Sequence, residues 1–494
     1  MSTNAASFDA PPAGNWSKPF NPSPSVLGVF NAPSSSESTN EVGRILAYNH
    51  KTYHAFFNES GFHNHMPHAL LAGYGAQASP QQLIDIFGFA NYLDKSFRLN
   101  NKAKYGTKPD GPLDPLTESD WNNKLGKAEH YWRYLAFFDK QLETDGIADV
   151  LLKYVFDERL QDKPYHMMAR FMGGVVHPLI HTGNGVEFNI PGCVAEGLAM
   201  TCMTSSKYAF LYPSDWLSHS YYNDKNKRSL STGEMIAKLL KDEKLDRDSL
   251  GLSRSQPTLE SDPLVKSGAA EHLLQEYVYA WDKTRGPSPD IPGAMEDLAW
   301  LTTLLVGAVS KFEKRWRHDF FLAHALTSYL YLASILEALP PHNETSSSDK
   351  LSPRLALLQA YLRMILLIWV LRGRPDFHIS DQLMSESVHV GQSEGPQWPE
   401  LLEVIRTHED EHAAKALRSL YYLDRRYGDR KGNILTGYDD AAHLDGTAFL
   451  RTARQLVRQF GAQQPPQSDM DDMYGWDFSG FFSDVPDNAP KNRL

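Results

Sequence analysis

The chain has 494 residues, 41% of them hydrophobic, and a formal net charge of −11, which is the composition of a globular protein with a substantial core. Its 49 basic and 60 acidic residues argue against nucleic acid or an anionic membrane surface as a partner. Cys193 and Cys202 are the only cysteines, too few for a disulfide framework, so we expect a reducing compartment, with the cytosol as the default.

The two ends of the chain differ from its middle in composition. Residues 1–38 are rich in Pro, Ser, Asn and Ala and predict a disordered tail, without the charged start and apolar core of a signal peptide. Residues 481–494 predict a flexible C-terminal tail, whose last three residues are only loosely similar to a peroxisomal S-K-L ending. We therefore expect one domain over residues 39–480.

Helical spacing of apolar residues recurs along that domain, and no alternating strand pattern competes with it. The first three helices are expected from Glu41, from Pro67 and from Pro80 to about residue 95. Further helices are predicted near 122–144, 147–160, 163–183, 191–204, 232–245, 262–283, 291–315, 318–339, 353–373, 398–427 and 445–460. The fold class is therefore all-α, a single large multi-helix domain.

No membrane span is expected. The most apolar run, Met364 to Leu371, is far shorter than the roughly 20 residues needed to cross a bilayer, and Arg363 and Arg372 bracket it.

His177 and His181 lie four residues apart within MMARFMGGVVHPLIHTGNGVEF. That spacing puts two imidazoles on one helix face, where they can bind one metal ion. Pro178 lies between them and predicts a kink or a fresh helix start at this point. The alternative is that both are ordinary helix residues, although a break in a helix beside two ligand-type side chains favours a functional site.

Other histidines are also clustered. His63, His65 and His68 lie in FHNHMPH, and His324 lies in an apolar segment where a lone histidine is more often a hydrogen-bonded core residue. In HEDEHAAKALR, the spacing puts His408, His412 and Lys415 on one edge of a predicted helix. The alternative for this last segment is a solvated charged face. A lysine buried there would have a lowered pKa and could take up carbon dioxide.

Nucleotide-binding motifs are missing from the sequence. Gly73-Tyr74-Gly75 lacks the third glycine and the preceding strand of a dinucleotide fingerprint, and there is neither a Walker loop nor a G-x-S-x-G elbow. Redox chemistry in this chain would therefore use a bound metal or a separate reductase.

Four segments together resemble the questin oxidase-like family of fungal secondary metabolism: NHMPHALLAGYG, ARFMGGVVHPLIHTGNGVEF, KRWRHDFFLAHALTS and DEHAAKALRSL. The similarity runs in order from about residue 41 to the closing YGWDFSG. The resemblance implies an oxygenase that opens the central ring of an anthraquinone in a Baeyer–Villiger-like cleavage to a benzophenone, with dioxygen as oxidant and NADPH as reductant.

The resemblance also implies a non-haem Fe(II) centre held by histidines and a carboxylated lysine. Carried onto this sequence, the ligands would be His65 or His68, His177, His181 and His324, with Lys415 as the modified lysine. His412, three residues before Lys415, is the expected catalytic residue, acting beside the ligands, and a direct ligand role for it stays open as the alternative.

Two other functions remain open on the sequence. One is a metal-free oxygenase in which the histidines act as bases on the same substrate. The other is a helical scaffold that binds a partner or a polyketide without altering it. Metal analysis of the purified protein distinguishes a metal-free oxygenase from an iron enzyme. Oxygen uptake with an anthraquinone distinguishes an enzyme from a scaffold.

Overall fold

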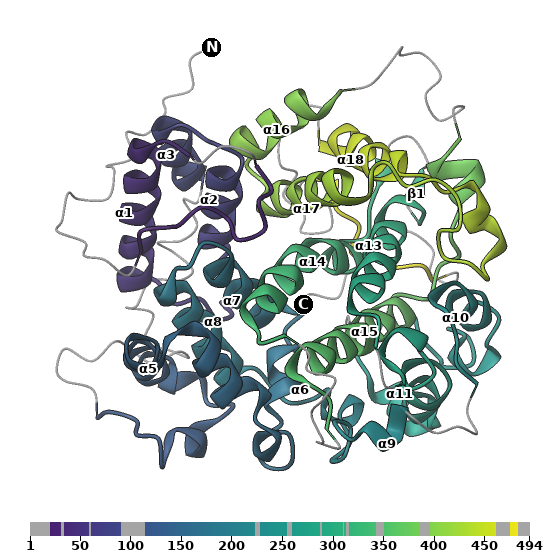
Figure 1. The fold of residues 1–494 in the computed structure, drawn as a ribbon, viewed down its shortest axis with the longest axis horizontal. Helices are drawn as coiled ribbons and strands as arrows, with labels where there is room; N and C mark the ends of the chain where they lie inside the picture. The colour runs from purple at the N-terminus through teal and green to yellow at the C-terminus, as the bar shows by residue number, and fades with distance from the viewer. Residues whose placement is uncertain are drawn as a thin grey trace.

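Helix α14, Phe320–Ala338, lies at the centre of the protein, and α7, α13, α15 and α17 pack around it (Figure 1). Every residue of α14 from Phe320 to Leu336 is buried. A helix that is apolar all round is stable in water only when other helices cover all of its faces.

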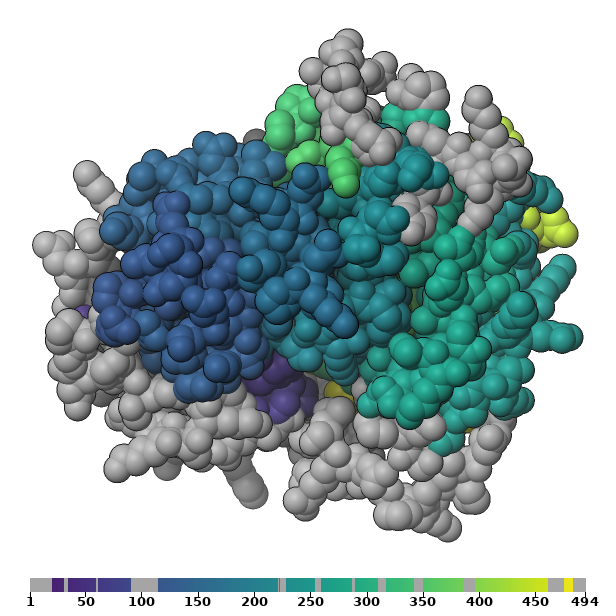
Figure 2. Space-filling view, turned by 90° about the horizontal axis from the view of Figure 1, so that it is seen from below, coloured from purple at the N-terminus to yellow at the C-terminus, as the bar shows by residue number. Residues whose placement is uncertain are grey.

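The computed structural model describes residues 20–30, 34–58, 61–89, 114–222, 228–253, 259–286, 289–309, 311–312, 316–341, 350–385, 396–460 and 475–482. Figure 2 shows one face of this body, where the blue residues of the first part of the chain lie beside the teal residues of its middle part.

The other helices alternate with short loops. They are α1 (Ser36–Thr52), α2 (Met66–Gly75), α3 (Pro80–Phe89), α5 (Tyr131–Leu151), α6 (Met167–Phe171), α7 (His177–Glu187), α8 (Pro191–Met203), α9 (His219–Tyr222), α10 (Thr232–Leu239), α11 (Asp262–Ser267), α12 (Ala269–Leu273), α13 (Ile291–Gly307), α15 (Pro353–Leu371), α16 (Trp398–Thr407), α17 (Glu411–Tyr427) and α18 (Thr447–Phe460).

Within the described residues, β structure is limited to isolated bridges and one antiparallel pair of two-residue strands, β1 (Lys311–Phe312) and β2 (Trp316–Arg317). The all-α prediction is confirmed. The pair explains why the helix predicted over 291–315 ends early, at Gly307.

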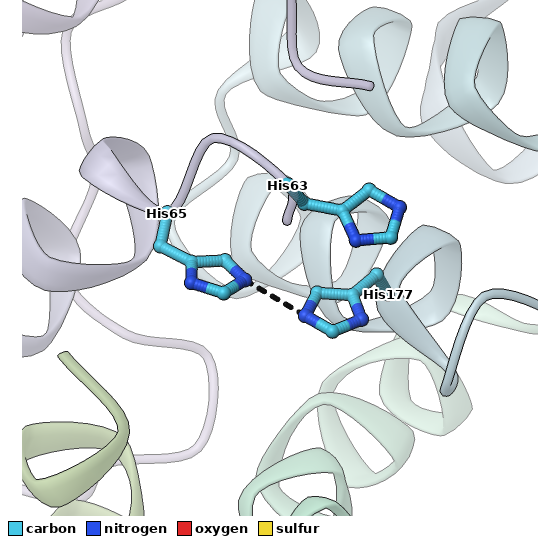
Figure 3. Close-up of side chains that lie close together, drawn as sticks. All are labelled: His63, His65 and His177. Atoms are coloured by element: carbon cyan, nitrogen blue, oxygen red, sulfur yellow. Dashed lines mark hydrogen bonds between the residues drawn. The ribbon is translucent and has the colours of Figure 1, made fainter. Parts of the chain in front are cut away.

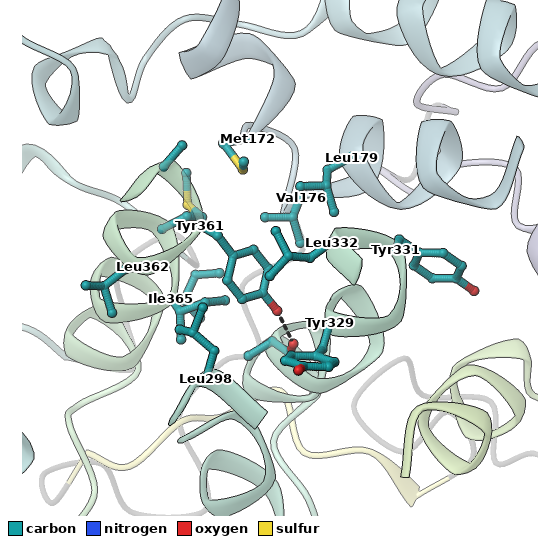
Figure 4. Close-up of a cluster of buried hydrophobic side chains, with 14 of the residues drawn as sticks. Met172, Val176, Leu179, Leu298, Tyr329, Tyr331, Leu332, Tyr361, Leu362 and Ile365 are labelled. Atoms are coloured by element: carbon teal, nitrogen blue, oxygen red, sulfur yellow. Dashed lines mark hydrogen bonds between the residues drawn. The ribbon is translucent and has the colours of Figure 1, made fainter. Parts of the chain in front are cut away.

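Two helices, α14 and α15, are long and apolar enough to cross a membrane by length and composition, but 94% of each apolar window is buried inside the protein. Their environment is that of core helices. Figure 4 shows this core, in which Tyr361 and Ile365 of α15 meet Tyr329 and Leu332 of α14.

The prediction of one continuous helix over 163–183 is wrong, because the structure has two helices there, α6 and α7. Gly174, Val175 and Val176 all have positive φ angles, and α7 then starts at His177 with Pro178 in its first turn. The fresh start expected at Pro178 is therefore confirmed. Two β-branched residues at positive φ are costly, by about 1–3 kcal/mol each, and such strain is typical of functional sites.

The single helix predicted over 398–427 is also divided, into α16 and α17. Asp410 is the N-cap of α17 and accepts a hydrogen bond from the Ala413 backbone N–H, while His408 ends α16. The prediction that His408, His412 and Lys415 share one helix edge is therefore wrong for His408. An aspartate three residues before a helix-forming run is a capping signal that the apolar periodicity concealed.

Part of the expected N-terminal tail lies against the body. Phe20 and Val29 are buried, and the backbone N–H groups of Ser23 and Val26 donate to carbonyls at the end of α7. At the other end, the Phe481 N–H donates to the Arg372 carbonyl. Residues 1–19 and 483–494 lie outside the described residues, so the expected tails stay predictions there.

Candidate metal centre

The N-terminal turns of four helices, α2, α7, α14 and α17, converge on one buried point. His65 is the N-cap of α2, His177 is the first residue of α7, and His412 lies in the first turn of α17. His324 lies one turn into α14, where Asp319 caps the helix by accepting from two backbone N–H groups. The sequence predicted that these four segments meet, and the structure brings them together.

His65 and His177 point their Nε2 atoms at each other, 2.7 Å apart (Figure 3). The Nδ1 atom of His177 lies 2.7 Å from the Gly174 carbonyl, which only an N–H can satisfy, so its Nε2 carries the lone pair. The Nδ1 atom of His65 lies 2.6 Å from a Glu411 carboxylate oxygen, so its Nε2 also carries a lone pair. Two lone pairs at this distance repel each other unless a cation lies between or beside them.

His324 and His412 complete the group. His324 donates Nδ1–H to the Phe320 carbonyl at 2.7 Å, which leaves its buried Nε2 as an acceptor without a partner. His412 likewise has a buried, unpartnered Nε2. The ligand-type nitrogens of His177, His324 and His412 lie within 4.8 Å of one another. Neighbouring ligands of one ion are about 3 Å apart when the bonds are about 2.1 Å long, so these nitrogens need only small shifts to share an ion.

Lys415 lies one turn beyond His412 on α17, is 1% exposed, and its Nζ has no hydrogen-bond partner. Burial lowers the pKa of this amine to about 8, against the opposing charges of Glu411 and Asp410. Near pH 8 a large part of the lysine is therefore the neutral, nucleophilic amine.

The imidazoles are neutral in this environment. Burial, together with the neighbouring Lys415, lowers the pKa of His65 to about 4 and that of His324 to about 3. Burial holds the pKa of His177 and His412 well below the ordinary value. The positive ends of the four helices also disfavour imidazolium and favour an anion at this point. Neutral imidazoles are the form that binds a metal ion.

His68 and His181, two further predicted ligands, form a separate branch. The Nδ1 atom of His181 lies 3.1 Å from Nε2 of His68, and its Nε2 lies 2.6 Å from a Glu196 carboxylate oxygen. His65 and His68 have ring centroids 5.3 Å apart, which joins this branch to the main group. Of the two residues that the sequence could not separate, His65 is the one that directly faces His177.

Three nearby residues were not among the predicted site residues. His63 stacks on His177 with ring centroids 4.1 Å apart, and its nitrogen belongs to one of the ligand-type groups with His65 and His177. A carboxylate oxygen of Glu411 accepts a hydrogen bond from Nδ1 of His65, and one of Glu196 accepts from Nε2 of His181. His63 lies in the same FHNHMPH segment, so its spacing was a usable signal, whereas each carboxylate acts on a histidine of another helix.

The donor set fits a metal ion. It combines neutral imidazole nitrogens with a lysine and a carboxylate, which suits iron or zinc better than calcium or magnesium. Several of these buried nitrogens have no hydrogen-bond partner. Each unsatisfied buried polar atom lowers the stability of the folded protein by about 1–3 kcal/mol. A bound ion would remove that cost.

We expect the metal-free protein to lose stability as the pH falls from 6.5 towards 4. Buried histidines such as His318, whose pKa burial lowers to about 4, stay neutral in the folded state and take up protons on unfolding. Each such group costs about 1.4 kcal/mol per pH unit in that range. The carboxylates of Asp139 and Glu196 outweigh burial and raise the pKa of His50 to about 10. This group therefore lowers stability as the pH rises above 6.5, outside the range of the prediction. Urea unfolding at about pH 6.5 and about pH 5 measures the difference, and equal stabilities would contradict it.

Comparison with known proteins identifies the family of this chain. The questin oxidase-like family matches residues 62–420, which contain every residue of the centre. The chain is 24% identical to the Baeyer-Villiger oxidase ptaJ of Pestalotiopsis fici, over 79% of this chain and 82% of the relative. It is also 24% identical to a questin oxidase of Aspergillus fumigatus, over 80% and 83% of the two chains, and to the oxidoreductase AflY of Aspergillus parasiticus, over 78% and 72%. All three names are those of oxidoreductases, and the match over most of its length shows that this chain belongs to the questin oxidase-like family.

Proposed function

We propose that this protein is an oxygenase of fungal polyketide metabolism that cleaves the central ring of an anthraquinone to a benzophenone, at a non-haem iron centre. The observation that supports the iron centre most directly is the pair of facing Nε2 lone pairs of His65 and His177, beside the orphaned nitrogens of His324 and His412. The names of the relatives, oxidases of the questin and Baeyer-Villiger type, support the reaction class.

The residues that would hold iron are His177, His324 and His65, with Lys415 as its carbamate. His412 and the His68 to His181 branch lie close enough to add ligands or to hold the water beside the ion. Bound iron(II) would supply the single electrons that dioxygen needs in order to react with a closed-shell aromatic substrate. Neutral nitrogens with one carboxylate-like oxygen are a donor set suited to that metal.

The chain's own residues would prepare the substrate. The neutral Nε2 of His412, whose pKa burial holds well below the ordinary value, can accept a hydrogen bond from a phenol of the substrate and so orient it beside the centre. The site is buried on all sides by helices, which keeps bulk water from the reacting carbonyl. Inserting one oxygen atom beside the carbonyl would give a seven-membered lactone, whose acyl C–O bond one water molecule would then cleave to open the ring to the benzophenone acid. The other oxygen atom would leave as water, with two electrons from NADPH. Because the sequence lacks a nucleotide fingerprint, we propose that a separate reductase delivers them.

Phe320 is an aromatic residue in ring contact with two histidines of the centre. Its ring centroid is 4.8 Å from those of both His324 and His412, and Phe478, which is partly exposed, stacks on it at 4.4 Å. These two stacked rings lie next to the histidines, and the outer ring, that of Phe478, is partly exposed. We propose that the planar substrate enters here and stacks on Phe320.

Replacing Phe320 by leucine should therefore raise KM with little change in metal content. Loss of an aromatic stacking partner is worth about 0.5–1.5 kcal/mol, or roughly a 2- to 10-fold increase in KM. Phe321→Leu is the matched control, because Phe321 lies under Arg372 and is not in ring contact with the histidines. Equal KM values for the two variants would place the substrate elsewhere.

The proposed function is tested by incubating the iron-loaded protein with an anthraquinone, NADPH and a reductase. Oxygen uptake together with a benzophenone of the expected mass would support it. Metal analysis of the same sample separates the alternatives: turnover by metal-free protein would favour a metal-free oxygenase, and binding of the anthraquinone without turnover would favour a scaffold.

A further inference from the structure

A chain of hydrogen-bonded side chains runs from the protein surface to the histidine cluster. Asp139 on α5 is 3.2 Å from Nε2 of His50 on α1, and Nδ1 of His50 is 2.9 Å from Glu196 on α8. Glu196 is in turn 2.6 Å from Nε2 of His181 on α7. Asp139 is 39% exposed at the outer end, whereas Glu196 and His181 are buried.

The inner part of this chain is costly to bury. Glu196 is the one charged residue of α8, whose other residues are apolar or small, and it is 1% exposed. Burying an ion pair is often no more favourable than burying apolar side chains of the same volume. The chain is therefore better explained by its effect on His181 than by a contribution to stability.

The packing of α7 on α8 keeps Glu196 beside His181. A Cβ atom on Gly197, the next residue of α8, would lie 2.3 Å from the Thr182 hydroxyl of α7, so the two backbones approach closely only because this residue is glycine. Phe20 covers the other end, with its ring 4.8 Å from that of His50. Each of the two carboxylate oxygens of Glu196 thus has its own imidazole partner, His50 at one and His181 at the other.

The consequence is a fixed tautomer for His181. A carboxylate only accepts hydrogen bonds, so Nε2 of His181 must carry a proton, and in the neutral imidazole Nδ1 then carries the lone pair. That Nδ1 faces His68 at 3.1 Å, and in the absence of a metal His68 must then donate its Nε2–H to it. Glu196 therefore determines which nitrogens of both histidines are available to the centre.

We propose that Glu196, held by His50, is a positioning residue that fixes the His181 tautomer with Nδ1 towards the histidine cluster and so raises the affinity of the cluster for its metal ion. This inference rests on the metal centre proposed above. Carboxylates that orient ligand histidines in this way typically change metal affinity by about 10- to 100-fold.

The first test uses the metal-free wild-type protein labelled with 15N-histidine, in which nitrogen chemical shifts distinguish protonated from unprotonated imidazole nitrogens. We expect His181 to be protonated at Nε2 and unprotonated at Nδ1. A proton on Nδ1 of His181 would overturn the inference, whether or not the protein binds metal.

The second test measures Co²⁺ affinity by competition with a chelator, followed by the visible absorption of the bound ion. We expect Glu196→Gln to lose about 10-fold and Glu196→Leu about 100-fold in affinity, with mixed His181 tautomers in the Gln variant. Asp242→Asn removes a carboxylate that lies 2.6 Å from Nε2 of His272, outside the histidine cluster, so it is the matched control and should bind Co²⁺ as the wild type does.

The outcomes are distinguishable. Wild-type affinity in both Glu196 variants would overturn this inference and leave the proposed function intact. Failure of the wild-type protein itself to bind Co²⁺ would refute the metal centre, and with it the effect of Glu196 on affinity. Glu196→Gln keeps the volume of the side chain and one acceptor, so it remains informative if Glu196→Leu does not fold.

Discussion

Replacing His177 by alanine is expected to remove the bound metal and lower turnover by more than about 100-fold, since losing a ligand should exceed the 10- to 100-fold effect of losing a residue that only orients one. The Nε2 of His177 faces that of His65 and also lies in the group formed with His324 and His412. His177 thus belongs both to the group with His65 and to the group with His324 and His412. Metal content by elemental analysis and oxygen uptake with an anthraquinone measure the two effects.

His318→Ala provides the matched control for this experiment. His318 is also a fully buried histidine, six residues before His324, but its Nδ1 bonds the side chain of Gln459. The two variants lose the same volume from the interior, so their costs in packing are comparable. We expect His318→Ala to keep its metal. A His177→Ala variant with full metal content and turnover would refute the metal centre proposed here.

Where the signal was local, the sequence identified histidines that the structure brings close together. The four-residue spacing of His177 and His181 and the proline between them are each read from a few neighbouring residues. An all-α fold follows from helical periodicity in the same way. These features need no knowledge of which helices touch.

Other features depend on contacts between distant segments and were not predictable. Glu411 is part of a charged run that is typical of a solvated face, and its role appears only because α17 packs beside α2 and His65. Glu196 gives no sign in the sequence that it bonds His181. The positive φ of Val175 and Val176 was equally hidden, because valine is the residue type least suited to that conformation.

The lysine of the centre gives the second large expected effect. Lys415→Met should lose metal and turnover to a similar degree as His177→Ala, although methionine fills much of the same space. The wild-type amine, with a pKa of about 8 and no hydrogen-bond partner, can attack carbon dioxide to form a carbamate with release of one proton. The carbamate is an anion, and the four helix N-termini that meet at this point favour a negative charge.

Three measurements check this step. Intact-mass analysis of the native wild-type protein should show the added mass of one carbon dioxide, and Lys415→Met should lack it. Exhaustive exchange into buffer free of carbon dioxide should lower metal affinity, and bicarbonate should restore it. Acetate should restore part of the affinity of Lys415→Ala, because it supplies a carboxylate in the space left by the side chain.

The pattern of these results separates two roles for Lys415. Loss of metal in Lys415→Met together with dependence on bicarbonate in the wild type requires the carbamate, since an amine ligand has no need of carbon dioxide. Loss of metal without an adduct and without dependence on bicarbonate would mean that the neutral amine itself contacts the ion. Full metal content and turnover in Lys415→Met would remove the lysine from the centre altogether, and the negative charge favoured by the helix N-termini would then have to come from Glu411 or from the oxygen-derived reactant.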